Sequence, residues 1–124
     1  MSATRSAITT HVLDSALGRP AAGVPVRLEA VTVSEDDTTE TTVLATGTTD
    51  GDGRITRLGP DEVGPGTYRL VFDVAAYSAA TGQSCFFPQV DITFLLTDGA
   101  SPSGAHYHVP LLLSPFAYST YRGS

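Results

Sequence analysis

Three side chains that could carry proton-transfer and anion-binding chemistry stand far apart in the sequence: His11, Arg54 and His108. An imidazole titrates near neutral pH and can take up or release a proton under physiological conditions. Arg54 directly follows the turn 50–53, which would present its guanidinium fork rigidly to a planar, carbonyl-rich ligand. Each residue also has a purely structural interpretation, as a surface or hydrogen-bonded core histidine or as an exposed arginine at the start of a strand.

A second group of reactive side chains lies at the C-terminal end, in Tyr121-Arg122-Gly123-Ser124. These four residues combine a phenol, a guanidinium, a hydroxyl and a free carboxylate. Chain ends usually fray and carry little information. The concentration of polar groups here predicts an end that is held in place and takes part in function.

Two short patterns resemble metal-binding motifs but lack the ligands that would complete them. His106 and His108 could supply two zinc ligands, yet local spacing fixes no third ligand. Asp50 and Asp52 open like a calcium loop, but its fifth position is Arg54 and no flanking helices are predicted. We therefore predict no metal and no cofactor.

Short strands must position these groups, because apolar and polar residues alternate over most of the chain. His11 falls opposite Ile8 on the first strand, and His108 falls opposite Val109, which is expected to fill the core. An alanine-rich segment predicts one short helix that Gly82 ends, and the acidic segment 34–40 predicts a solvated hairpin connection. Seven or eight short strands with one helix are typical of an antiparallel sandwich with Greek-key connections. The predicted extended segments are 7–13, 24–33, 41–49, 54–58, 68–74, 90–96 and 107–113, and the predicted helix is 75–81.

The composition sets further limits on structure and partners. The length of 124 residues predicts a single domain, 1–124, with one core. The net charge of −6 argues against a nucleic-acid partner, and the absence of lysine excludes Schiff-base chemistry by a lysine side chain. Cys85 is the only cysteine, is expected to be buried, and favours a reducing compartment. With no long apolar run and no signal-peptide pattern, we expect no membrane association and a cytoplasmic location.

Three blocks of sequence together resemble the 5-hydroxyisourate hydrolases, the enzyme branch of the transthyretin-like family. The stretch HYHVPLLLSPFAYSTYRGS (106–124) is similar to that family's YHVPLLLSP-type strand and YRGS ending. The block HVLDSALGRPAAGVPV (11–26) is similar to its opening signature, and DGDGR (50–54) resembles the turn that carries its active-site arginine. The blocks occur in the family's order, so the resemblance covers nearly the whole chain.

The resemblance implies an all-β fold, a transthyretin-like antiparallel β-sandwich of two four-stranded sheets with one short helix. It implies hydrolysis of 5-hydroxyisourate to 2-oxo-4-hydroxy-4-carboxy-5-ureidoimidazoline in urate degradation, with no cofactor. It also implies a homotetramer whose sites lie where the tails of neighbouring subunits meet. The apolar residues on both faces of the last strand fit burial against another subunit.

For this reaction, the chemistry of the side chains leads to a hypothesis on the role of each residue. One of His11 and His108 would activate water, and which of them is the base stays open. Arg54 would bind the substrate and offset charge on the carbonyl oxygen. The C-terminal residues would complete the site: Arg122 on ring carbonyls, Tyr121 against the ring, and Ser124 orienting the water or a histidine.

Two other functions compete with the hydrolase. One is a non-catalytic carrier of a small hydrophobic molecule, the transthyretin branch proper, which lacks the two histidines and the YRGS ending. The other is a β-sandwich interaction module, because function does not follow from fold. A module of that kind would tolerate loss of the last four residues, whereas the enzyme would lose activity while staying folded.

Overall fold

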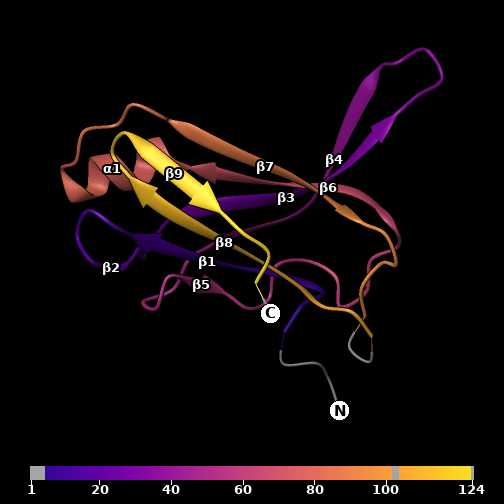
Figure 1. Cartoon of the computed structure of the whole chain (residues 1–124), viewed down its shortest axis with the longest axis horizontal. Helices are drawn as coiled ribbons and strands as arrows, with labels where there is room; N and C mark the ends of the chain where they lie inside the picture. Colours follow the sequence, from indigo (N-terminus) through magenta and orange to yellow (C-terminus); the bar gives the residue numbers. More distant parts are fainter. Residues whose placement is uncertain (1–4, 102–103, 124) are drawn as a thin grey trace.

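A computed structural model describes residues 5–101 and 104–123, so Ser124 lies outside the described residues. Two sheets pack face to face, with one short helix at one end of the molecule (Figure 1). The elements are β1 (Ile8–Asp14), β2 (Arg19–Pro20), β3 (Pro25–Val33), β4 (Thr39–Thr48), β5 (Arg54–Ile55), β6 (Gly66–Asp73), α1 (Val74–Thr81), β7 (Gln89–Leu96), β8 (Tyr107–Ser114) and β9 (Ala117–Thr120). The predicted sandwich with one helix is confirmed.

The first sheet contains the segments with the predicted site residues. Its strand order is β2-β1-β8-β9, and β5 pairs with β1 beside β2. The second sheet has the order β4-β3-β6-β7. The sheets therefore have five and four strands rather than four each, because the two-residue strands β2 and β5 both add to the free edge of β1.

One strand pair departs from the expected antiparallel arrangement, since β1 and β8 run parallel over seven residue pairs from Ile8↔Tyr107 to Asp14↔Leu113. A second difference is β9, which the sequence did not separate from β8. The chain reverses at Pro115 and Phe116, and Leu111 then pairs with Thr120. This reversal brings the C-terminal residues back along β8 toward its histidine.

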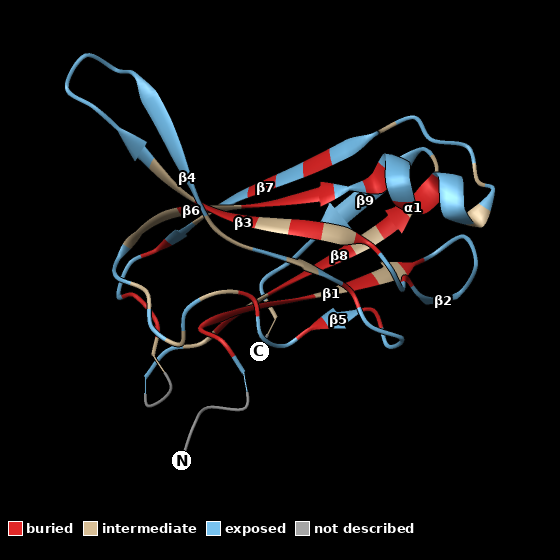
Figure 2. Cartoon of the chain, turned by 180° about the vertical axis from the view of Figure 1, so that it is seen from behind, coloured by how far each residue is buried: buried red, intermediate tan, exposed pale blue. Residues whose placement is uncertain are grey.

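The core lies between the inner faces of the two sheets, where the alternation of each strand places its apolar residues. Figure 2 shows buried segments on β1, β8, β3 and β6. The first sheet contributes Ile8, Val12, Val109 and Leu111, and the second contributes Val26, Leu28, Leu70 and Phe72. Because successive side chains point to opposite faces, Thr9, His11 and His108 are left for the outer face of the first sheet.

The helix α1 is fixed to the first sheet by a buried carboxylate. Asp73 caps its N-terminus by accepting a hydrogen bond from the backbone N–H of Ala76, and Gly82 ends it in the left-handed conformation, as expected. Tyr77 donates a hydrogen bond of 2.6 Å to Oδ2 of Asp14, and Gln83 donates one of 2.9 Å to the same oxygen. Oδ1 of Asp14 also accepts a hydrogen bond of 2.9 Å from the backbone N–H of Leu17 in the turn after β1.

The outer face of the second sheet carries an ionic group. Glu29 lies on this face but is only 4% exposed, because two arginines cover its carboxylate. Arg27 Nε lies 2.7 Å from Oε2, and Arg69 binds Oε1 through Nε and Nη2 at 2.9 and 2.8 Å. This group lies on the sheet that does not carry the histidines, so it serves as an independent probe of stability.

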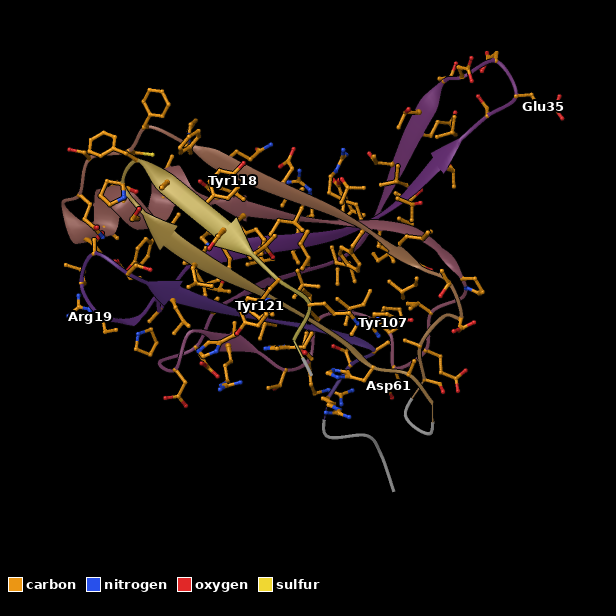
Figure 3. The ribbon with its side chains drawn as sticks, viewed as in Figure 1. Arg19, Glu35, Asp61, Tyr107, Tyr118 and Tyr121 are labelled. Carbon is orange, nitrogen blue, oxygen red and sulfur yellow. The ribbon has the colours of Figure 1, made fainter. Side chains whose placement is uncertain are left out.

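Three surface features complete the fold. The hairpin of β3 and β4 projects from the body of the molecule, with Glu35 near its tip (Figures 1 and 3). This agrees with the predicted solvated connection over residues 34–40. Cys85 was expected to be buried, and this prediction is wrong: the residue is exposed on the loop between α1 and β7. The rings beside it form an aromatic cluster in which Phe86 contacts Phe87 and Phe116, and Phe87 contacts Tyr118; Phe86, Phe116 and Tyr118 are exposed, so this part of the loop does not enter the core. No helix in the described ranges has the length and apolar character needed to span a bilayer.

Candidate active site

The register of three strands brings the predicted residues together. His11 on β1 faces Arg54 on β5 across one edge, and Thr9 on β1 faces His108 on β8 across the other. Paired strands lie about 4.8 Å apart, so these side chains start from neighbouring positions on one sheet. Residues separated by more than forty positions in sequence thus share one outer face.

A cavity of about 170 Å³ lies at this place and is open to solvent. Arg54 and His108 line it together with His106, which the sequence analysis considered only as a metal ligand, and with four residues that it did not single out: Arg5, Thr9, Thr10 and Thr56. Arg54 is exposed. Its turn is rigid because Asp50 Oδ1 accepts hydrogen bonds from the backbone N–H groups of Asp52 and Arg54. The cavity therefore combines a fixed guanidinium with an imidazole.

His108 is the more enclosed of the two predicted histidines. Its Nδ1 lies 2.8 Å from the hydroxyl oxygen of Thr9. Within the described part of the chain, its Nε2 has no hydrogen-bonding partner. Burial, followed by the positive Arg54 side chain and by His11, lowers the pKa of His108 below its ordinary value. The ring is therefore neutral at pH 7 and able to accept a proton.

His11 lies beside this cavity and is held differently. Its Nε2 is 2.9 Å from the backbone carbonyl oxygen of Asp52. A carbonyl oxygen only accepts hydrogen bonds, so the ring nitrogen must carry the proton and donate it. In the neutral ring Nδ1 is then the basic atom. The turn that orients Arg54 therefore also orients His11.

The C-terminal segment is anchored directly on His108. Gly123 donates its backbone N–H to the carbonyl oxygen of His108 at 2.8 Å. A Cβ at position 123 would lie 2.6 Å from Cδ2 of the imidazole, well inside van der Waals contact. Only glycine allows the backbone to approach this closely. The C-terminal segment is thus held in place as far as Gly123, as expected.

Tyr121 and Arg122 lie elsewhere within one chain. The Arg122 guanidinium stacks over the Tyr107 ring, 4.5 Å from its centroid. Both residues line a second cavity, of about 250 Å³ and mainly apolar, between β7, β8 and the segment after β9. Figure 3 shows Tyr121 on that segment, and its side chain is 56% exposed. One chain therefore brings His11, Arg54 and His108 together but not the side chains of the two C-terminal residues.

The family model described as "HIUase/Transthyretin family" matches residues 8–123. The chain belongs to this family. It is 42% identical to the 5-hydroxyisourate hydrolase of Mus musculus, with all of both chains covered. It is 47% identical to the "Uric acid degradation bifunctional protein TTL" of Arabidopsis thaliana, over 97% of this chain but only 38% of the plant protein's length.

Solved structures of both branches resemble this family member to the same degree. The 5-hydroxyisourate hydrolase of Klebsiella pneumoniae superposes with a TM-score of 0.75 at 33% identity, covering 94% of this chain and 98% of that one. Sea bream transthyretin in complex with thyroxine gives a TM-score of 0.78, also at 33% identity, with 94% and 93% covered. Similarity of fold therefore does not distinguish the hydrolase from the transthyretin that binds thyroxine. The side chains that line the cavity must provide that distinction.

Among the cavity side chains to which the sequence analysis gave no catalytic role, Thr9 and His106 are the two that are linked to His108 by hydrogen bonds. Thr9 alternates with His11 on the same strand face, which was a usable signal. His106 was considered only as a metal ligand. Among residues 5–101 and 104–123, no group of three or more His, Cys, Asp or Glu side chains is placed to hold a metal ion. His106 instead lies 3.2 Å from the Thr9 hydroxyl through its Nε2.

Proposed function

We propose that this protein hydrolyses 5-hydroxyisourate to 2-oxo-4-hydroxy-4-carboxy-5-ureidoimidazoline, a step of urate degradation. The observation that carries the proposal is the convergence of His108 and Arg54 on one cavity, with His11 hydrogen-bonded to the turn beside it. The mouse and Salmonella dublin relatives named as 5-hydroxyisourate hydrolases, at 42% and 41% identity, support the same conclusion.

In this mechanism His108 is the general base. Its Nδ1 is held by Thr9, which leaves Nε2 to remove a proton from the attacking water. The lowered pKa of His108, caused first by burial, keeps the ring neutral. Hydroxide then adds to the ring carbonyl, and a negative charge develops on the carbonyl oxygen.

Arg54 offsets this charge with its guanidinium, a contribution of about 3–4 kcal/mol for a well-placed donor. His11 can donate or accept at the substrate through Nδ1, because Nε2 is occupied by the Asp52 carbonyl. The reaction is an addition of water followed by cleavage of a carbon–nitrogen bond. It uses protons and hydrogen bonds that the chain's own side chains supply.

The C-terminal residues complete the site only in an oligomer. We propose a homotetramer in which Tyr121 and Arg122 reach the cavity of a neighbouring subunit and Ser124 orients the water. The exposed aromatic cluster beside β9 and the half-buried Leu112 support a covered surface. A single domain over 1–124 and a cytoplasmic location complete the proposal, the latter supported by the free thiol of Cys85, which a reducing compartment preserves.

Carriage of a small hydrophobic molecule is the second candidate. The thyroxine complex of sea bream transthyretin and the mainly apolar cavity beside Tyr121 favour it. It leaves the polar cavity of Arg54 and His108 without a role. A carrier would bind an aromatic hormone analogue stoichiometrically and would not accelerate decay of 5-hydroxyisourate.

The test follows the absorbance of freshly generated 5-hydroxyisourate. The wild-type protein is expected to accelerate its decay, and His108→Asn and Arg54→Lys to lose about 100-fold or more in kcat/KM. Arg19→Lys is the matched control, since Arg19 is an exposed arginine opposite Asp14 at the far end of β1. A wild-type protein without activity, or a fully active His108→Asn variant, would overturn the proposal.

A further inference from the structure

The hydroxyl of Thr9 lies between two imidazoles. Its Oγ1 is 2.8 Å from Nδ1 of His108 and 3.2 Å from Nε2 of His106. Thr9 is only 4% exposed, and its backbone is fixed because β1 pairs with β8 on one edge and β5 on the other. The two rings are thus joined through a single buried oxygen atom.

A hydroxyl has one proton, so Thr9 donates to one ring nitrogen and accepts from the other. In one arrangement His108 donates from Nδ1, and Thr9 donates to His106. His108 then has a free electron pair on Nε2. In the reverse arrangement His106 donates to Thr9, Thr9 donates to His108, and Nε2 of the neutral His108 ring carries the proton. The protonation of His106 therefore decides whether His108 can act as a base.

We propose that Thr9 and His106 are positioning residues that hold His108 in its basic tautomer and take up the proton it removes from water. This inference rests on the proposed function. The water proton moves to Nε2 of His108, the Nδ1 proton moves to Thr9, and the Thr9 proton moves to Nε2 of His106. The result is hydroxide bonded to the substrate carbon and an imidazolium at His106. Reversal of the same transfers returns the proton to the departing nitrogen.

The two rings differ in the cations that surround them. The groups that lower the pKa of His108 after burial are Arg54, His11, His106 and Arg5, and the two arginines among them carry a permanent positive charge. Burial, and after it Arg5 alone, lowers the pKa of His106. A proton on His106 therefore avoids the repulsion that Arg54 exerts at His108. It also leaves the Arg54 guanidinium to interact with the developing oxyanion.

Two variants of Thr9 separate the hydroxyl from the packing. Thr9→Val keeps the shape and removes the hydroxyl, and Thr9→Ser keeps the hydroxyl. We expect Thr9→Val to lower kcat by roughly 10- to 100-fold with KM within about two-fold, and to shift the acid limb of the pH profile. Thr9→Ser should return kcat to within about three-fold of wild type. His106→Gln, whose amide cannot take up the proton, should resemble Thr9→Val and serves if the valine variant does not fold.

A measurement without substrate keeps this inference separate from the proposed function. Nitrogen-15 NMR of the histidine rings reports which nitrogen carries the proton. We expect His108 to be protonated at Nδ1 in the wild type and to lose this preference in Thr9→Val. A wild-type ring protonated at Nε2, or a Thr9→Val variant with unchanged kcat and pH profile, would overturn the inference. Absence of wild-type turnover with the Nδ1 tautomer present would instead overturn the proposed function.

Discussion

Adding one methyl group at Gly123 is expected to disable the site while leaving the fold intact. In Gly123→Ala the new Cβ would lie 2.6 Å from Cδ2 of His108, whereas ordinary contact begins near 3.4 Å. The imidazole or the C-terminal segment must therefore move by about 0.8 Å. If the ring moves, its 2.8 Å contact with Thr9 lengthens beyond hydrogen-bonding distance. If the segment moves, the backbone hydrogen bond from Gly123 to His108 is lost.

A displacement approaching 1 Å at a catalytic group costs on the order of 100-fold in rate. We therefore expect kcat for 5-hydroxyisourate to fall by roughly that factor. The free energy of unfolding should fall by only about 1 kcal/mol, the net value of one hydrogen bond. Steady-state kinetics and chemical denaturation measure the two quantities. Gly64→Ala is the matched control, because nothing lies within 4 Å of its added Cβ. A Gly123→Ala protein with wild-type kcat would refute the close contact with His108.

Three further outcomes follow from groups described above. Tyr77→Phe should cost about 1–3 kcal/mol at pH 7 in denaturation experiments, because it removes a donor from buried Asp14. Burial raises the pKa of Asp14, but its hydrogen bonds outweigh burial and the net pKa is lowered. This stabilisation is therefore present above about pH 4 and is lost as the pH falls through the folded-state pKa. An equal cost of Tyr77→Phe at pH 7 and at a pH below the folded-state pKa would contradict this reasoning. Glu29→Gln should lower the free energy of unfolding by about 1–3 kcal/mol and leave turnover unchanged. As the control, Glu40→Gln at an exposed position should change the free energy of unfolding by less than about 0.5 kcal/mol. A loss of activity in Glu29→Gln would show that the second sheet is coupled to the site. The acid limb of kcat/KM should have its midpoint below 6.5, because burial and neighbouring cations lower the pKa of His108, and a midpoint above 6.5 would remove His108 as the base.

Solved structures that share this fold include a 5-hydroxyisourate hydrolase and a transthyretin in complex with thyroxine, and the two faces of the first sheet suggest where such functions can differ. Its core side is filled by apolar side chains of both sheets. The outer face of β1 and β8 is not needed for packing, so it can carry imidazoles, hydroxyls or apolar groups without loss of the sandwich. Changes of function on this framework therefore act through the outer face and the C-terminal segment.

Local patterns in the sequence were sufficient for the helix, the long strands and most of the candidate residues, but not for the short strands β2 and β9. Alternation places Val109 inward and His108 outward whatever the partner strand is, because the side-chain period of an extended chain is two. Gly82 marks the helix end because it adopts the left-handed conformation that other residues avoid. The blocks around His11, Arg54 and residues 106–124 indicated the family in the same way, through local sequence.

Only the tertiary structure decided which of these residues meet. The parallel register of β1 and β8 sets Thr9 beside His108, and no local pattern specifies the pairing of strands so far apart in sequence. The reversal at Pro115 and Phe116 brings Gly123 onto His108, and the packing of surface aromatics leaves Cys85 exposed. The hydrogen bond between Thr9 and the two imidazoles likewise exists only because two strands pair in this register. Local sequence thus determined the residues of the site, and long-range strand pairing determined their geometry.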